Sequence, residues 1–124
     1  MPSERTEKIA VIGTGYVGLT TGAALAHFGF DVACCDVDQR KVDLLNSGSI
    51  PIVETGLAEL VGAGRDAGRL TFHLGSDPAV RDADLVFLCV PTPQDDDGSA
   101  DLSYVRDAAA EIGPMLKAGA VVVN

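Results

Sequence analysis

The chain has 124 residues, of which 47% are hydrophobic, so it can form one globular domain with a modest core and has no room for a second. Its 18 acidic and 9 basic residues give a net charge of −9, which argues against a nucleic-acid or anionic-membrane surface, because both need clustered lysine and arginine. A phosphate ligand is compatible with this charge, since backbone N–H groups at a helix N-terminus bind phosphate without basic side chains.

The cysteines Cys34, Cys35 and Cys89 lie in apolar runs and form no CxxC pair. Neighbouring residues of a strand point to opposite faces, so we expect no disulfide between Cys34 and Cys35, and free buried thiols are typical of a reducing compartment. The charged N-terminus lacks the apolar stretch of a signal peptide, and no apolar run reaches the ~20 residues of a membrane span. We therefore expect a cytoplasmic domain that contacts no membrane.

The first half of the chain alternates strand and helix patterns. A short β-branched run predicts a buried strand at 8–13, and the periodicity of 16–28 predicts a helix that Gly29 ends. A second strand is expected at 30–36. The larger apolar side chains of the helix, which we expect on one face, are Val17, Ala24, Leu25 and Phe28.

Two short helices and an edge strand follow. The helices are predicted at 41–46 and at 55–64, where Thr55 is available as the N-cap. The alternating apolar residues of 69–74 predict a strand near the edge of a sheet.

The last third continues the alternation. Residues 76–83 predict a short helix, with Asp77 as its cap and Pro78 in its first turn, and the apolar run 84–90 predicts a central strand. A helix started by Asp101 and a strand at 120–124 complete the pattern. The apolar stripe of that helix comprises Val105, Ala108, Ala109, Ile112 and Leu116.

Strands that alternate with helices and are almost entirely apolar indicate an α/β fold whose parallel sheet is covered on both faces. Right-handed crossovers then produce a Rossmann-type doubly wound parallel sheet, truncated here after about five strands.

The segment GTGYVG follows the first strand and opens the first helix, and this context gives the three glycines distinct roles. Gly13 allows a tight turn out of the strand, Gly15 lets backbone approach a pyrophosphate, and Gly18 lets the helix pack closely on the sheet. The helix N-terminus offers free N–H groups and a partial positive charge to the phosphates. The alternative is a flavodoxin-like or sensor domain in which the glycines only form a turn.

Asp36 closes the second strand, where a carboxylate accepts hydrogen bonds from the hydroxyls of an adenosine ribose. A 2′-phosphate would meet the like charges of Asp36 and Asp38, so the pattern favours NAD over NADP. Lys41 lies about one helical turn further on and can reach the adenosine side, although a solvated surface lysine explains it equally well.

Val90, Pro91 and Thr92 follow the fourth strand at its carboxyl end, across the switch point from the glycine turn, where ligands of open α/β sheets bind. The next loop contains three consecutive aspartates, Asp95 to Asp97. Such a run on a loop usually faces water, and no second set of ligands accompanies it, so we expect no metal site.

Four segments, GTGYVGLTTGAALAHFGFDV, DVDQRKVDLLNSG, IPIVETGL and VPTPQDDDGSADLSYV, together resemble the N-terminal domain of the UDP-glucose/GDP-mannose dehydrogenase family, over residues 8–124. The resemblance is nearest to the members that act on UDP-glucose. The family commonly has IPIYEPGL where this chain has IPIVETGL, and the valine also occurs in members that act on GDP-mannose, so Val53 and Thr55 leave the sugar nucleotide open.

The resemblance implies an NAD-dependent oxidation of a nucleotide sugar at C6, from alcohol to carboxylate, in two hydride transfers. It implies cofactor contacts at the 13–18 turn, especially at Tyr16 and Val17, ribose contacts at Asp36 and Lys41, and a cofactor path lined by Val90, Pro91 and Thr92. It also implies a full-length homodimer and a substrate bound mainly by a C-terminal part.

The family's catalytic residues lie beyond Asn124, so we expect residues 1–124 to be the NAD-binding domain of a longer enzyme and to contain no catalytic residue. His27 and His73 are interpreted as structural. Two alternatives stay open: another NAD-dependent dehydrogenase, of the 6-phosphogluconate or 3-hydroxyisobutyrate type, and a non-catalytic nucleotide sensor.

Overall fold

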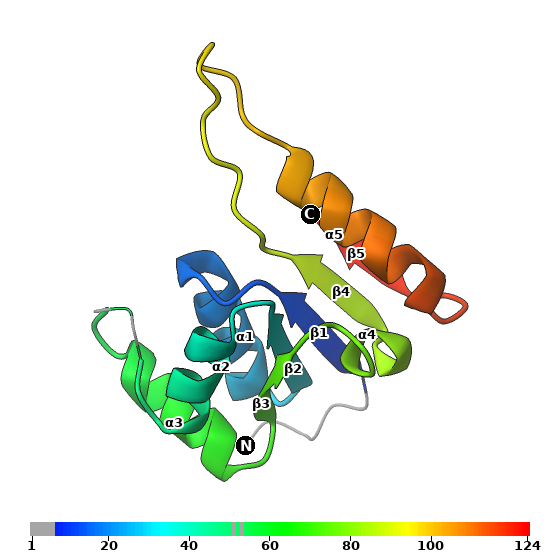
Figure 1. Ribbon diagram of the computed structural model, residues 1–124. Helices are drawn as coiled ribbons and strands as arrows, with labels where there is room; N and C mark the ends of the chain where they lie inside the picture. The colour runs from blue at the N-terminus through cyan, green and yellow to red at the C-terminus, as the bar shows by residue number, and fades with distance from the viewer. Residues whose placement is uncertain (1–6, 51, 53) are drawn as a thin grey trace.

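The apolar run that begins at Lys8 forms the middle strand of a five-stranded sheet, because neighbouring strands and helices bury it from both sides (Figure 1). The structure is a computed structural model and describes residues 7–50, 52 and 54–124. Val53 lies outside the described residues. The strands are β1 (Lys8–Ile12), β2 (Asp31–Asp36), β3 (Leu70–Leu74), β4 (Leu85–Leu88) and β5 (Val121–Val123). The helices are α1 (Tyr16–His27), α2 (Gln39–Asn46), α3 (Leu57–Asp66), α4 (Ala79–Asp82), α5 (Ser103–Ile112) and the 3-10 helix η1 (Gly113–Met115).

The strand order is β3-β2-β1-β4-β5, and every pairing is parallel. This order confirms the predicted Rossmann-type α/β fold, in which the chain winds outwards first on one side of β1 and then on the other. The predicted edge position of β3 is confirmed, and β4 lies between β1 and β5 as a central strand should. The switch point therefore lies between β1 and β4.

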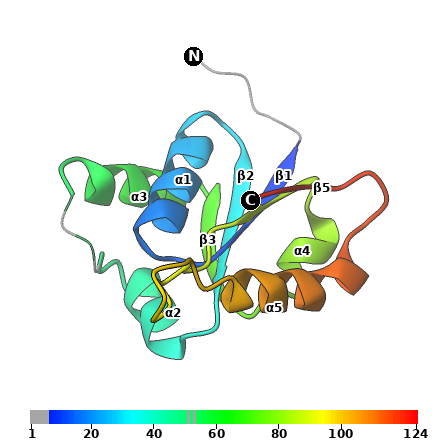
Figure 2. The same ribbon diagram turned by 90° about the horizontal axis from the view of Figure 1, so that it is seen from above.

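Helices cover the two faces of the sheet and form two separate cores (Figure 2). On one face α1 and α3 pack around Leu19, Val32 and Leu70, and on the other α4 and α5 pack around Val86 and Ile112. Cys34 belongs to the first core and Cys35 to the second, and both thiols are free, as expected from the alternation of β2.

The predicted helix is confirmed as α1, but its buried face does not carry all four of the larger apolar side chains, of which Ala24 and Leu25 are half-buried. Val17 and Phe28 are 62% and 57% exposed, whereas the buried residues are mostly the smaller ones, Gly18, Leu19, Gly22, Ala23 and Ala26. The physical reason is distance: a Cβ on Gly22 would lie 2.6 Å from the Cys34 sulfur, so α1 lies too close to β2 for large side chains. Gly29 does end the helix, with a φ of 100°.

None of the three predicted helix caps occupies the N-cap position. The N-cap of α3 is Gly56, in the left-handed region, and Thr55 makes no capping bond. The N-cap of α4 is Pro78, and the Asp77 carboxylate instead accepts a bond from Arg81 Nε at 2.9 Å. The N-cap of α5 is Leu102, and Asp101, one residue earlier, accepts a hydrogen bond from the Ser103 N–H at 2.9 Å. The unpredicted cap is Asp38, whose side chain accepts from Arg40 N–H and starts α2 two residues before 41.

The α5 stripe is correct for Ala108 and Ile112, which are buried, and for half-buried Val105. Ala109 is exposed, and Leu116 lies beyond α5 and η1. Among the described residues, no helix has both the length and the apolar character that crossing a membrane requires.

Candidate functional site

The carboxyl ends of β1, β2 and β4 border a cavity of about 790 Å³. The glycine turn, the end of β2 and the segment after β4 line this cavity together, and α5 closes its far side. The structure brings nine of the ten predicted site residues together there, namely Gly13, Gly15, Tyr16, Val17, Asp36, Lys41, Val90, Pro91 and Thr92. The tenth, Gly18, lies beneath the turn and is buried.

The first glycine forms the tight turn that the sequence predicts. Gly13 has a φ of 103°, and its N–H donates to the Cys35 carbonyl at 2.8 Å. A Cβ there would lie 2.5 Å from the Cys89 carbonyl oxygen. The position therefore requires glycine both for its backbone angle and for the closeness of the chain that follows β4.

The other two glycines differ in what surrounds them. A Cβ on Gly18 would overlap the Gly13 carbonyl oxygen and would lie 3.3 Å from the Cys89 Cβ. The start of α1 therefore lies close both to the glycine turn and to the segment that follows β4. A Cβ on Gly15 would meet nothing within 4 Å. The chain's own packing thus explains Gly18, but it leaves the bare backbone of Gly15 facing open space.

The N-terminus of α1 has no partner from a side chain in the described structure. Its N-cap is Gly15, no side chain caps it, and its first turn contains no acidic residue. A helix N-terminus carries unpaired N–H groups and a partial positive charge. This end of α1 therefore suits an anion such as a diphosphate.

The Asp36 carboxylate is half-buried and held by three donors. Its Oδ2 accepts from the Thr14 hydroxyl at 2.6 Å and from the Thr14 N–H at 2.9 Å, and its Oδ1 accepts from the Asp38 N–H at 3.0 Å. Burial alone would raise the pKa of Asp36, but these hydrogen bonds and the charge of Lys41 outweigh burial and hold the pKa below its ordinary value. Asp36 is therefore an ionised acceptor at the cavity wall.

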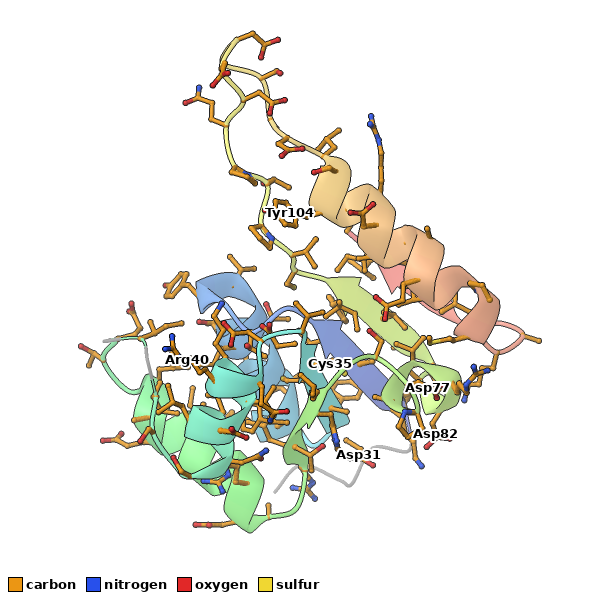
Figure 3. The ribbon with its side chains drawn as sticks, in the orientation of Figure 1. Asp31, Cys35, Arg40, Asp77, Asp82 and Tyr104 are labelled. Carbon is orange, nitrogen blue, oxygen red and sulfur yellow. The ribbon has the colours of Figure 1, made fainter. Side chains whose placement is uncertain are left out.

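The sequence did not identify the α5 side of the cavity. Tyr104, Asp107 and Glu111 line it from α5, and Figure 3 shows Tyr104 where α5 begins, beside the segment that follows β4. The spacing of these residues, three or four apart, is the helical signal that would have placed them on one face. Buried Ser76, which follows the end of β3, is a further lining residue that no motif indicates.

The cavity wall also contains two of the thiols. Burial raises the pKa of Cys35 to about 12, and the negative charges of Asp36 and Glu111 act in the same direction. Burial likewise raises the pKa of Cys89. Both thiols are therefore protonated at neutral pH and unsuited to nucleophilic work.

The aspartates of the loop after β4 and the two histidines make local contacts. The Asp97 carboxylate accepts hydrogen bonds from the N–H and hydroxyl of Ser99, which stabilise the turn of the projecting loop. His73 is hydrogen-bonded to Thr71 at 2.8 Å, and the His27 ring lies against Phe28. In the part of the chain that the structure describes, no group of three metal-ligating side chains is close enough to hold an ion.

These features together fit a dinucleotide. The elongated diphosphate needs a bare backbone and a helix N-terminus, which Gly15 and α1 provide, and the ribose hydroxyls need an ionised acceptor, which Asp36 provides. The apolar part of the wall, from Val17, Val37 and Val90, suits the flat face of a base.

Comparisons with known proteins agree with this geometry. Residues 7–124 match the family described as "UDP-glucose/GDP-mannose dehydrogenase family, NAD binding domain". The chain is 48% identical over 118 residues to the UDP-glucose 6-dehydrogenase TuaD of Bacillus subtilis, covering 95% of this chain and 26% of that protein.

Two solved structures are also similar. A UDP-glucose dehydrogenase from the archaeon Pyrobaculum islandicum has a TM-score of 0.88 at 37% identity, over 98% of this chain and 29% of that one. A ternary complex of GDP-mannose dehydrogenase from Pseudomonas aeruginosa has a TM-score of 0.79 at 42% identity, over 86% of this chain and 24% of that one. The chain thus spans about a quarter of the length of the relatives it matches. It belongs to the UDP-glucose/GDP-mannose dehydrogenase family and forms the NAD-binding domain of that family.

Proposed function

We propose that the cavity at the carboxyl ends of the strands holds NAD, with its diphosphate over the glycine turn and its adenosine ribose on Asp36. The carrying observation is that the ionised Asp36 carboxylate lines the same cavity as the bare backbone of Gly15. In this proposal Gly13, Gly15, Tyr16, Val17 and Gly18 form the diphosphate site. Asp36 and Lys41 hold the ribose, and Val90, Pro91 and Thr92 line the path towards the reactive end.

We further propose that the whole protein oxidises the C6 hydroxyl of a nucleotide sugar, UDP-glucose, to a carboxylate in the cytoplasm, as a homodimer. NAD⁺ supplies the hydride acceptor, and oxidation of a primary alcohol to a carboxylate needs two such transfers and one water. Residues 1–124 orient the cofactor, and the catalytic groups belong to another part of the protein. The identities to two UDP-glucose enzymes, 48% and 37%, lie on either side of the 42% identity to the GDP-mannose enzyme, so the UDP-glucose assignment rests on the resemblance of the sequence motifs to the members that act on UDP-glucose. GDP-mannose and UDP-N-acetylmannosamine are the alternative substrates.

The substrate proposal is tested by the absorbance of NADH on the full-length protein with UDP-glucose, GDP-mannose and UDP-N-acetylmannosamine in turn. We expect two NADH per molecule of UDP-glucose and little with the other two. NADH from another sugar alone would reassign the substrate. No NADH from any of them, with NAD binding intact, would favour the non-catalytic sensor.

The site proposal is tested by Asp36→Ala. We expect NAD binding to weaken at least tenfold, because the ribose hydroxyls lose a charged acceptor worth about 1.5–3 kcal/mol. NADP binding should weaken less, because repulsion of the 2′-phosphate disappears with the carboxylate. Titration of both cofactors measures the ratio, and equal losses would show that Asp36 is not the ribose ligand.

A further inference from the structure

The residue between the first two glycines of the turn is a buried threonine whose hydroxyl is already hydrogen-bonded. Thr14 is 2% exposed, and it is one of two buried polar residues among those described. Its hydroxyl donates to Asp36 Oδ2 at 2.6 Å, which is shorter than the bond from its own N–H at 2.9 Å. The diphosphate turn and the ribose carboxylate are thereby joined by a side chain that lies between them.

The two oxygens of Asp36 are not equivalent in this arrangement. Oδ2 receives both Thr14 donors, whereas Oδ1 receives only the Asp38 N–H. A carboxylate oxygen has about two lone-pair sites, so Oδ1 keeps the larger free capacity for a ligand hydroxyl. Without the Thr14 hydroxyl the carboxylate would keep one donor on each oxygen and could rotate more freely.

We propose that Thr14 is a positioning residue for cofactor selection, whose hydroxyl holds the ionised Asp36 carboxylate in the orientation that accepts a ribose bearing a free 2′-hydroxyl. The proposal rests on the proposed NAD site and adds to it a residue outside the three glycines. Any residue except proline would supply the N–H donor at this position, so the hydroxyl is the specific contribution of threonine. A short hydrogen bond from a buried hydroxyl to a charged oxygen is among the stronger kinds.

The same contact predicts a pH effect. Burial opposes ionisation of Asp36, and the Thr14 hydroxyl is the foremost of the groups that lower its pKa. Removing that donor should raise the pKa, so that binding which needs the ionised form is lost at a higher pH than in the unaltered protein. The other titratable groups that line the same cavity are Tyr16 on α1, Cys35 on β2, Asp38 in the following turn, Lys41 on α2, Cys89 after β4, and Tyr104, Asp107 and Glu111 on α5.

The test compares Thr14→Val, Thr14→Ala and Thr14→Ser in the full-length protein, with Thr55→Val as a control at an exposed threonine that makes no capping bond. We expect the valine and alanine variants to bind NAD about tenfold more weakly and to lose part of their preference over NADP. The midpoint of the acid loss of NAD binding should rise. The serine variant and the control should match the unaltered protein. Melting temperatures show which variants fold, and the alanine variant serves if valine does not fit.

A double variant separates this inference from the site proposal. In the Asp36→Ala background, Thr14→Ala should change NAD affinity less than twofold, because the hydroxyl then has no carboxylate to hold. If Asp36→Ala alone leaves NAD binding unchanged, the site proposal fails. If Asp36→Ala weakens binding but alanine and serine at 14 give equal affinities and equal pH midpoints, the role of Thr14 is overturned.

Discussion

At the scale of single residues, Gly15 and Gly18 look alike in the motif and differ in their surroundings. The Gly13 carbonyl fills the space where a Cβ of Gly18 would lie, whereas the space at Gly15 is empty to 4 Å. The fold therefore requires glycine at 18. At 15 the chain itself imposes no such requirement, which agrees with our proposal that the diphosphate approaches the bare backbone there.

This contrast predicts that one alanine variant loses stability and the other loses NAD binding. Gly18→Ala should destabilise the protein by about 3 kcal/mol, the upper range for overpacking, because the obstacle is backbone and cannot move aside. Gly15→Ala should change the free energy of unfolding by less than about 1 kcal/mol and still weaken NAD binding by about tenfold, because its methyl would occupy the place that we propose for the diphosphate. Urea unfolding and NAD titration measure the two quantities. Equal losses of stability would contradict the distinction.

The motif predicts Gly13 and Gly18, where the fold requires glycine: Gly13 has a positive φ and Gly18 lies against the Gly13 carbonyl. It does not predict Thr14, Ser76 or Glu111. Their place in the cavity wall depends on which distant segments meet, and a single sequence specifies that only through the whole topology.

At the scale of elements, the sequence predicts the positions of the strands better than it predicts which face of a helix is buried. All five strands are found within two residues of their expected ends, because continuous apolar runs are strong signals. Large apolar side chains predict one face of α1, whereas the structure buries mostly small side chains together with Leu19. Where a helix crosses a strand at short range, only small side chains fit between them. The hydrophobicity of a sequence does not indicate how close the two elements lie, so it does not predict which face is buried.

The contact between α1 and β2 gives a coupled prediction. Gly22→Ala should destabilise the protein by about 1–2 kcal/mol, because its Cβ would lie 2.6 Å from the Cys34 sulfur and overpacking exceeds the gain in helix propensity. In a Cys34→Ala background the sulfur is gone, and the same change should become stabilising by up to about 1 kcal/mol. A thermal or urea double-mutant cycle measures the coupling.

Gly62→Ala on α3 is the matched control. A Cβ at Gly62 would meet nothing within 4 Å, so the substitution should be stabilising whether or not Cys34 is present. A Gly22→Ala effect that is the same in both backgrounds would show that the sulfur is not the obstacle.

At the scale of the whole molecule, the sheet has two ends, and each borders a cavity. The larger one lies at the carboxyl ends of the strands. The smaller, of about 440 Å³, lies beside the starts of β1 and β2 and next to α4, in the region where Figure 3 labels Asp31 and Asp82. Its charges are already paired in part, since Lys8 bonds Asp82 at 2.8 Å and Arg81 bonds Asp77 at 2.9 Å. Parallel strands in a doubly wound sheet direct ligands to their carboxyl ends, which favours the larger cavity.

Two substitutions distinguish the cavities because they change the net charge by the same amount. Lys41→Ala and Arg81→Ala each remove one positive charge from a chain of net charge −9, so the variants share the same net charge and differ in the place of the lost charge. Lys41 lines the larger cavity and Arg81 the smaller.

Because the Lys41 side chain is exposed, we expect its loss to weaken NAD binding only about fivefold, which corresponds to about 1 kcal/mol, while Arg81→Ala leaves the affinity unchanged. Titration at two ionic strengths measures both, since the local difference should persist when added salt screens the general field. If Arg81→Ala weakens NAD binding more than Lys41→Ala does, the cofactor binds at the smaller cavity. The assignment of Asp36 as the ribose ligand would then fail.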